Sequence, residues 1–298
     1  MRFHPTIKTI LKAAVSIAII ALVLRSIDPE LLLGVMRQAQ PGWLLWAALW
    51  FILSKLIGAF RFNDLLKTGG VYLDTRPQLR LYWLGMYYNL LLPGGISGDA
   101  YKIKILMDRF DRPFRRLFSI TLFDRLSGVL ALGQICLVLA FLLPPLQPFG
   151  WLWGLALLAS IPVSKILFDR MIGVGKKVWL RTSVQSLGVQ LAQLVSTLGI
   201  VLALQEWPDW PGYAVVFLIS SVVAMLPFTI GGAGARELTF LWGAQLLELN
   251  PERSVALAFL FYLISTAVAL FGIIYSFRSE ILLAPGELKP TGEESTKP

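Results

Sequence analysis

The sequence has few of the groups that soluble enzymes and secreted domains use. Of its 298 residues only 15% are charged and 56% are apolar, against about 25% charged and about 45–50% apolar in soluble domains. The single cysteine, Cys136, cannot form an internal disulfide, and together with the single histidine, His4, it cannot complete a zinc site or a nucleophilic catalytic pair. These scarcities exclude a soluble enzyme, a disulfide-stabilised secreted domain and a disordered chain, and leave a polytopic membrane protein.

Positive charge exceeds negative charge, with 27 Lys and Arg against 18 Asp and Glu and a formal net charge of +9. In a membrane protein such an excess is typical of loops that face anionic lipid, and we expect no nucleic-acid partner. The sequence contains no Walker A pattern, so we expect no ATP hydrolysis by the chain. We also expect no metal and no cofactor.

Six apolar runs approach the roughly 20 residues that a helix needs to cross a bilayer. They cover residues 10–24, 43–60, 117–143, 151–168, 184–204 and 255–277. The first run follows a short basic lead without a small-residue cleavage signal, so we expect an uncleaved anchor. The expected fold class is an all-α polytopic membrane protein with about six spanning helices.

Two further apolar segments are interrupted by proline and glycine. Residues 81–92 are followed by Pro93, Gly94, Gly95 and Gly98, and residues 213–226 by Pro227, Gly231, Gly232 and Gly234 before the apolar run 238–249. Proline and clustered glycine end helices, and an arm of about 12–15 residues reaches only about 18–22 Å of a roughly 30 Å hydrocarbon core. We therefore predict two re-entrant hairpins.

Most Lys and Arg residues fall on one side of the predicted topology. They lie in the two terminal segments and in residues 61–80, 99–116 and 165–181, whereas the opposite loops hold only Arg25, Arg37 and Arg253. By the positive-inside rule we expect a multi-pass protein of the inner (plasma) membrane with both termini cytoplasmic. We expect one transmembrane domain over residues 1–283 and a disordered cytoplasmic tail over residues 284–298.

The two interrupted segments resemble each other. The pattern Leu-Pro-x-x-Ile-small-Gly occurs at residues 92–98 and again at 226–232, and a cation, Lys102 or Arg236, lies ten residues after each leucine. Each half would contain two spans, a hairpin that does not cross, and one further span. The number of crossings per half is therefore odd, so the second half has the opposite orientation in the membrane. We therefore predict an inverted repeat of residues about 10–143 and about 151–277, as in secondary transporters.

The breaks offer features that favour an anion. A helix that follows a glycine turn points its free N–H groups and its positive dipole end toward the break, and glycine lets a ligand approach the backbone. Lys102 and Arg236 add full positive charge within the first two turns. In a membrane the natural anion is a lipid phosphate. The alternative is a pair of plain hairpin turns whose cations snorkel to the interface.

Charged residues inside apolar segments cost about 2.5–3.5 kcal/mol each to insert, so each needs a partner or a role. Asp124 and Arg125 are expected to pair across the bundle or to line the pathway, with snorkelling as the alternative for Arg125. Asp99 either caps the following helix or, with Asp124 and Glu237, carries protons. Lys55 is expected to snorkel.

Both breaks resemble signatures of one family. Residues 89–102 (NLLLPGGISGDAYK) and 227–237 (PFTIGGAGARE) are similar to the two signatures of the lysylphosphatidylglycerol synthase transmembrane-region family, also described as flippase-like. Arg61 in the sequence AFRF also resembles a family position. The resemblance implies a membrane module similar to a flippase for aminoacylated lipid. We expect a stand-alone form without the soluble synthase domain, so the synthase activity is not carried over.

The leading hypothesis is a translocase that moves an anionic or aminoacylated phospholipid headgroup, or that of a related lipid, between leaflets. A non-transporting accessory subunit of a lipid or glycolipid pathway and a membrane-embedded transferase stay open as alternatives. Membrane phospholipids are the expected ligands, and a separate lipid-synthesising enzyme is a candidate partner. The candidate binding residues are Asn89, Pro93, Gly94, Gly95, Gly98, Asp99, Lys102, Asp124, Arg125, Pro227, Gly231, Gly232, Gly234, Arg236 and Glu237.

Overall fold

The computed structural model describes residues 29–91, 97–173, 175–225 and 234–277, and every regular element within these ranges is a helix. In chain order the elements are α2 (Pro29–Gln38), α3 (Pro41–Thr68), α4 (Thr75–Leu91), α5 (Ser97–Phe110), α6 (Phe114–Ala140), η1 (Pro144–Phe149), α7 (Gly150–Met171), α8 (Lys176–Ala203), η2 (Trp207–Asp209), α9 (Trp210–Met225), α10 (Ala235–Leu246), α11 (Pro251–Leu270) and α12 (Ile273–Phe277). The predicted all-α fold class is confirmed.

Six helical segments of the described chain are long and apolar enough to cross a bilayer. They are Pro41–Thr68, Phe114–Ala140, Leu146–Met171, Lys176–Ala203, Trp207–Met225 and Pro251–Ser276. Five correspond to predicted runs, whereas the predicted run 10–24 lies outside the described residues. The prediction that the apolar segment 213–226 is too short to cross is wrong, because the helical segment Trp207–Met225 has 19 residues and is long enough. The helical segment begins earlier because Pro208 and Pro211 occupy first turns, where a missing N–H costs no hydrogen bond.

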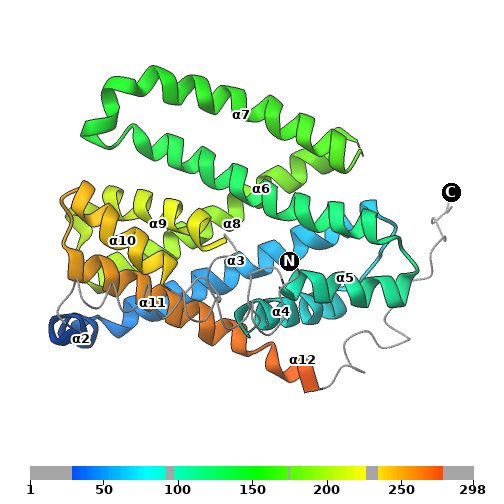
Figure 1. Cartoon of the computed structure of the whole chain (residues 1–298), viewed down its shortest axis with the longest axis horizontal. Helices are drawn as coiled ribbons and strands as arrows, with labels where there is room; N and C mark the ends of the chain where they lie inside the picture. The colour runs from blue at the N-terminus through cyan, green and yellow to red at the C-terminus, as the bar shows by residue number, and fades with distance from the viewer. Residues whose placement is uncertain (1–28, 92–96, 174, 226–233, 278–298) are drawn as a thin grey trace, which may run out of the picture.

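The two longest helices, α3 and α8, pack along each other in opposite directions. Each has 28 residues, and their contact is the most extensive between any two elements of the described chain. Near one end the Gln40 N–H donates to the Ala203 carbonyl at 3.1 Å, and toward the other end Arg181 Nε pairs with Asp64 Oδ2 at 2.9 Å. Figure 1 shows α6 and α11 lying alongside this pair, and α7 lying on the outer side of α6.

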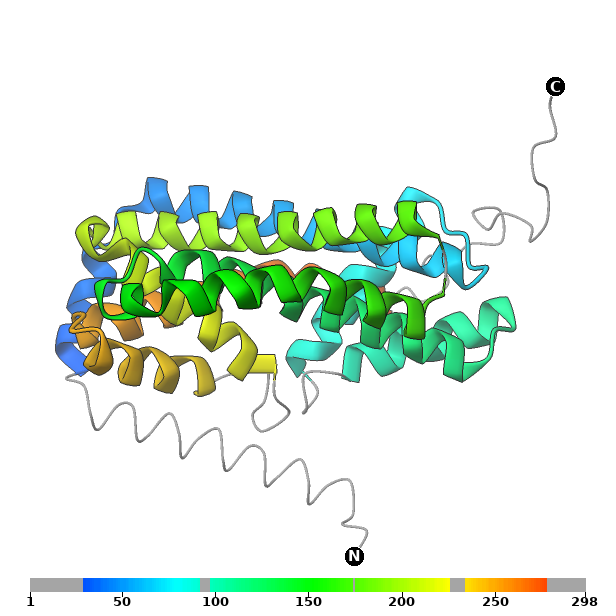
Figure 2. The same ribbon diagram turned by 90° about the horizontal axis from the view of Figure 1, so that it is seen from above.

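The segments that flank the two breaks form helical hairpins at opposite ends of the molecule. Helix α4 packs against α5, and α9 against α10; Figures 1 and 2 show the two pairs at the two ends of the long axis. Helices α4, α5 and α10 have 17, 14 and 12 residues, so at about 1.5 Å per residue each is shorter than a hydrocarbon core. Re-entry into the bilayer and the inverted repeat stay predictions.

The breaks themselves lie outside the described residues. This applies to six of the candidate binding residues, which are Pro93, Gly94, Gly95, Pro227, Gly231 and Gly232. It also applies to the predicted tail, residues 284–298. The structure therefore tests the positions of the helices on either side of each break and of the polar residues that those helices carry.

Each hairpin packs in a separate cluster of buried hydrophobic side chains. Leu84 of α4 and Leu106 of α5 are buried in one cluster with side chains of α3 and α6. Tyr213 and Phe217 of α9 and Phe240 of α10 are buried in a second cluster with side chains of α8 and α11. In lipid, helices associate through close van der Waals packing rather than through water exclusion. The two clusters therefore fix the two hairpins independently against the long helices.

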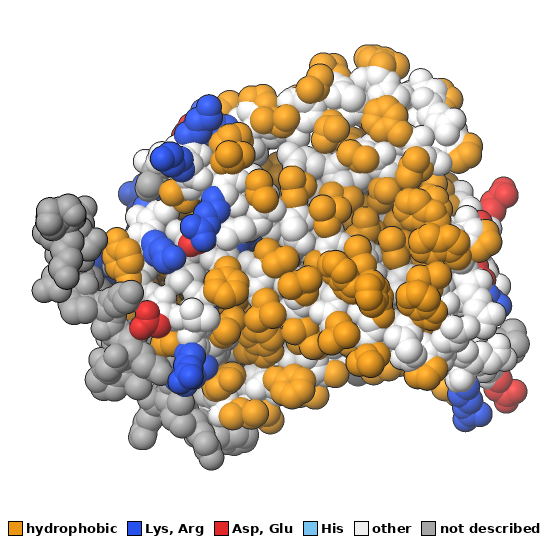
Figure 3. Space-filling model, turned by 180° about the vertical axis from the view of Figure 1, so that it is seen from behind, with side chains coloured by type: hydrophobic (Ala, Val, Ile, Leu, Met, Phe, Trp, Pro, Cys, Tyr) orange, Lys and Arg blue, Asp and Glu red, His pale blue; other side chains and the backbone are white. Residues whose placement is uncertain are grey.

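The outer surface of the molecule is apolar around its middle. Figure 3 shows hydrophobic side chains over this region, with most of the visible Lys and Arg side chains at one end. Helix α7 contributes exposed apolar side chains to this surface, and its Leu155 and Leu158 are 60% and 68% exposed. Soluble monomers rarely expose contiguous apolar surface of this extent. The chain is a multi-pass membrane protein whose apolar surface faces lipid.

Gly98 determines how closely α4 and α5 approach. A Cβ atom at this position would overlap the carbonyl oxygen of Gly85. Gly98→Ala should therefore separate the two helices and lower the thermal unfolding temperature, followed by tryptophan fluorescence of the protein in detergent. Gly133→Ala in α6 is the matched control, because a Cβ there meets nothing within 4 Å, and alanine favours helix over glycine by roughly 0.5–1 kcal/mol. Equal unfolding temperatures for the two variants would contradict this packing.

Candidate functional site

A cavity of about 280 Å³ lies between the two hairpins. Its wall includes side chains of α3, α4, α5, α6, α8, α9 and α10, so both halves of the predicted repeat contribute to it. The polar lining residues are Lys55, Arg61, Tyr82, Asn89, Asp99, Lys102, Asp124, Arg125, Gln190, Gln193, Ser221 and Arg236. The helix bundle thus contains a strongly polar space, and charges at membrane depth need a role or a partner that compensates for them.

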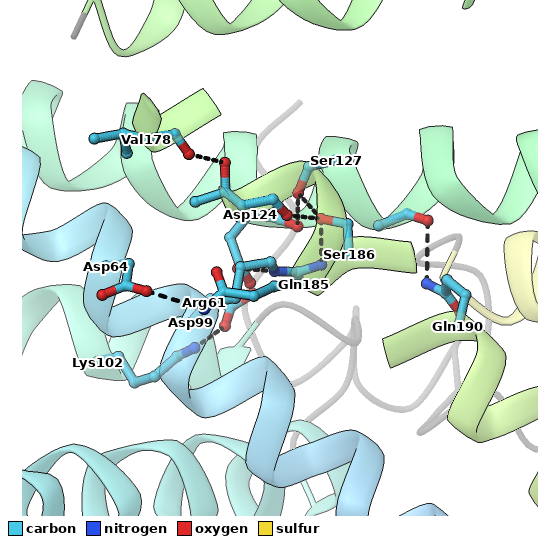
Figure 4. A network of polar contacts seen from close by, with 12 residues as sticks. Arg61, Asp64, Asp99, Lys102, Asp124, Ser127, Val178, Gln185, Ser186 and Gln190 are labelled. Atoms are coloured by element: carbon cyan, nitrogen blue, oxygen red, sulfur yellow. Dashed lines mark hydrogen bonds and ion pairs between the residues drawn. The ribbon is translucent and has the colours of Figure 1, made fainter. Parts of the chain in front are cut away.

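A buried ion pair joins α3 to α6 at the cavity wall. Arg61 Nε lies 2.8 Å from Asp124 Oδ1, and the two side chains are only 6% and 12% exposed. Arg61 Nη1 also donates to the Ser186 hydroxyl of α8 at 3.0 Å, and Ser186 lies 3.2 Å from the Ser127 hydroxyl. Figure 4 shows Arg61 at the centre of this network. One guanidinium therefore connects three helices.

A second group of charges ties α5 to α6. The Asp99 carboxylate lies 2.7 Å from Lys102 Nζ through Oδ1 and accepts a hydrogen bond from Arg125 Nε through Oδ2. Lys102 Nζ also lies 4.2 Å from the centroid of the Phe62 ring. Asp99 sits in the first turn of α5 and uses both carboxylate oxygens in ion pairs. This placement disagrees with the alternative that Asp99 is a helix cap.

Two further cations lie in the wall without a carboxylate partner among the described residues. Arg236 Nη1 donates to the hydroxyls of Ser220 and Ser221 at 3.0 and 3.3 Å. Lys55 Nζ lies 4.4 Å from the centroid of the Phe51 ring. In total, five Lys and Arg side chains and two Asp side chains line the cavity. The lining therefore carries a surplus of three positive charges.

Six of the candidate binding residues line this cavity. They are Asn89, Asp99, Lys102, Asp124, Arg125 and Arg236. Lys102 and Arg236, which follow the two breaks in sequence, thus reach the same space from opposite hairpins. Asp124 and Arg125 both pair across the bundle and line the cavity, so Arg125 does not simply snorkel.

Three other candidates are not in the cavity wall, and each has a local structural role. Gly98 lies against Gly85 and donates its N–H to Asn89 Oδ1 at 2.9 Å. Gly234 is the N-cap of α10 with φ of 83°, a left-handed conformation that favours glycine. Glu237 Oε2 accepts the Gly234 N–H at 2.8 Å, closing a capping interaction. The expectation that these three residues contact a ligand stays a prediction.

Several lining residues were not among the predicted site residues. Lys55 was expected to snorkel, but the structure places it in the cavity wall. Gln190 and Gln193 also line the cavity and lie three residues apart, on one face of α8. Two amides on one face of a predicted spanning segment were a usable signal. Arg61 was noted only through the family resemblance.

The fold and the cavity together define a polytopic helical membrane protein with a cationic internal site between two interrupted helical hairpins. The chain belongs to the lysylphosphatidylglycerol synthase transmembrane-region family: the family model described as "Lysylphosphatidylglycerol synthase TM region" matches residues 9–272. No curated protein matches the chain. The membership links the chain to membrane proteins of lysylphosphatidylglycerol synthesis and flipping.

The Arg61–Asp124 pair makes a testable contribution to stability. Arg61→Met leaves the Asp124 carboxylate buried without its counter-charge, a loss that costs about 3–5 kcal/mol in buried pairs. Arg61→Met with Asp124→Leu removes both charges and should regain most of that loss. Equilibrium unfolding in mixed detergent micelles measures both. Lys165→Ala is the control, because its pair with Asp169 is solvent-accessible and worth about 0–1 kcal/mol. A double variant less stable than Arg61→Met would contradict the pairing.

Proposed function

We propose that this protein moves the polar headgroup of an anionic or aminoacylated phospholipid between the leaflets of the membrane while the acyl chains stay in lipid. The observation that carries the proposal is the cavity between the hairpins, which lies inside a membrane-spanning bundle and has five cationic and two acidic side chains in its wall. The surplus of positive charge favours an anion, and phospholipid headgroups are the abundant anions at a membrane. Membership of the family supports the same function.

The proposed route uses the two hairpins as the moving parts of an inverted repeat. Their positions at opposite ends of the long axis and the antiparallel packing of α3 on α8 support this arrangement. Rocking of one half against the other would open the cavity to one leaflet at a time, as in transporters with inverted repeats. In this proposal the protein is a transporter rather than a synthase, and a separate enzyme supplies the lipid.

The proposed topology places both termini in the cytoplasm of a cell with the protein in its inner membrane. Arg109 at the end of α5 and Asp209 in η2 are both exposed and lie on opposite sides in this topology. In a variant in which Ser replaces Cys136, Asp209→Cys should react with a membrane-impermeant maleimide in right-side-out vesicles. Arg109→Cys should react only after detergent is added. Labelling of both cysteines before detergent would contradict the topology.

Transport is measured with purified protein in phosphatidylglycerol vesicles that carry fluorescent phosphatidylglycerol in both leaflets. Dithionite added outside should quench about half of the fluorescence in protein-free vesicles and nearly all of it when the protein is present. The loss of the inner-leaflet fluorescence reports the rate at which lipid moves outward. Arg236→Ala should slow this loss about tenfold or more, because a charge-assisted hydrogen bond contributes about 1.5–3 kcal/mol. Lys165→Ala, on the surface of α7 and outside the cavity lining, should keep the wild-type rate. Wild-type vesicles that behave like protein-free vesicles would contradict the proposal.

A further inference from the structure

The cations in the cavity wall are of two kinds. Three of them, Arg61, Lys102 and Arg125, pair with Asp99 or Asp124, and these two carboxylates compensate for two of the three positive charges. Lys55 of α3 and Arg236 of α10 pair with no carboxylate in the ranges that the structure describes. Two of the three surplus positive charges therefore lie on these two side chains, one from each half of the chain.

Arg236 is held in place but keeps donors available. Its guanidinium lies over two aromatic rings, 4.7 Å from the Phe261 centroid and 5.2 Å from the Phe217 centroid. Its Nη1 donates to Ser220 and Ser221, while Nε and Nη2 have no acceptor among the residues described. Stacking holds the plane of a guanidinium and leaves its edge for hydrogen bonds. The free edge of Arg236 is thus prepared for an acceptor from outside the protein.

Lys55 of α3 has a similar position in the cavity wall. Its Nζ lies over the Phe51 ring, and no hydrogen-bond acceptor for it exists in the described part of the chain. A lysine inside an apolar helix is costly unless an anion compensates for it. Since both Lys55 and Arg236 line the same cavity, a single anion between α3 and α10 can compensate for both.

We infer that Lys55 and Arg236 form a phosphate subsite, with the edge of Arg236 donating to phosphate oxygens and Lys55 providing a point charge. This combination is well suited to phosphate, because Arg offers a planar pair of donors and Lys a compact cation. The inference rests on the proposed function, and it assigns the binding of the anion to two of the five cations in the cavity wall. The ligand chemistry is a phosphate with net negative charge, supplied either by a lipid headgroup or by free phosphate.

The test is calorimetric titration of the purified full-length protein in detergent with three probes. These are dihexanoyl-phosphatidylglycerol, dihexanoyl-phosphatidylcholine, whose quaternary amine cancels the phosphate charge, and inorganic phosphate. Phosphatidylglycerol should bind, and Lys55→Met and Arg236→Met should each weaken its binding about tenfold or more. Phosphatidylcholine should bind at least about tenfold more weakly to the wild type. Inorganic phosphate that binds less tightly than phosphatidylglycerol identifies the lipid as the source of the anion, and equal binding identifies free phosphate; both support the subsite.

Stability separates loss of the subsite from loss of the fold. Neither cation forms an ion pair with a carboxylate of the described residues, so Lys55→Met and Arg236→Met without ligand should unfold at or above the wild-type temperature. Lys165→Met, outside the cavity lining, should bind like the wild type. The inference is overturned if phosphatidylcholine binds as tightly as phosphatidylglycerol, if both cavity variants bind like the wild type, or if Lys102→Gln weakens binding as much as they do.

The binding and transport experiments can fail independently. Binding of phosphatidylglycerol that depends on Lys55 and Arg236, in a protein that does not move lipid, would support the subsite and remove the proposed translocase. Lipid movement that neither variant slows would keep the translocase and remove the subsite.

Discussion

Ionised side chains inside an apolar helix bundle need opposite charge beside them, because water is not there to solvate them. The neighbours Asp124 and Arg125 of α6 show how this constraint organises the structure. Successive residues of a helix point about 100° apart, so Asp124 reaches Arg61 of α3 and Arg125 reaches Asp99 of α5. One turn of α6 thereby fixes the position of α3 and of the first hairpin. The polar cavity is a direct result of this arrangement.

The second hairpin brings charge to the same cavity without matching carboxylates among the described residues. Arg236 is positioned by aromatic rings and by serine hydroxyls, and Lys55 approaches from α3. Because these residues come from different halves of the chain, a motion of one half against the other would change the site that they form. A charged cavity with side chains from both halves of the chain in its wall is what the proposed lipid translocation requires. Figure 3 shows hydrophobic side chains over the middle of the face in view.

The sequence predicted the helical class and five of the six spanning segments because bilayer thickness imposes a length and a composition that are visible in one dimension. It also placed Lys102 and Arg236 near one site, since the repeated pattern carried both. It could not assign Lys55, because the direction of a side chain toward lipid or toward a cavity depends on how the helices pack. Gly98 and Glu237 were predicted to bind the ligand, whereas their close helix contact and helix-capping interaction depend on the packing of the backbone and were not predicted. The partner of Asp124, Arg61, lies 63 residues away and was not predictable from local pattern.

The central claim is that the cavity between the hairpins receives an anionic lipid headgroup at its unpaired cations. An electron cryo-microscopy structure of the protein in nanodiscs of phosphatidylglycerol tests it most directly. We expect density for a lipid phosphate within hydrogen-bonding distance of Arg236 and close to Lys55, with the acyl chains leaving toward the bilayer. Lipid phosphates found only around the outer surface, with Lys55 and Arg236 each paired to a carboxylate of the protein, would contradict the claim.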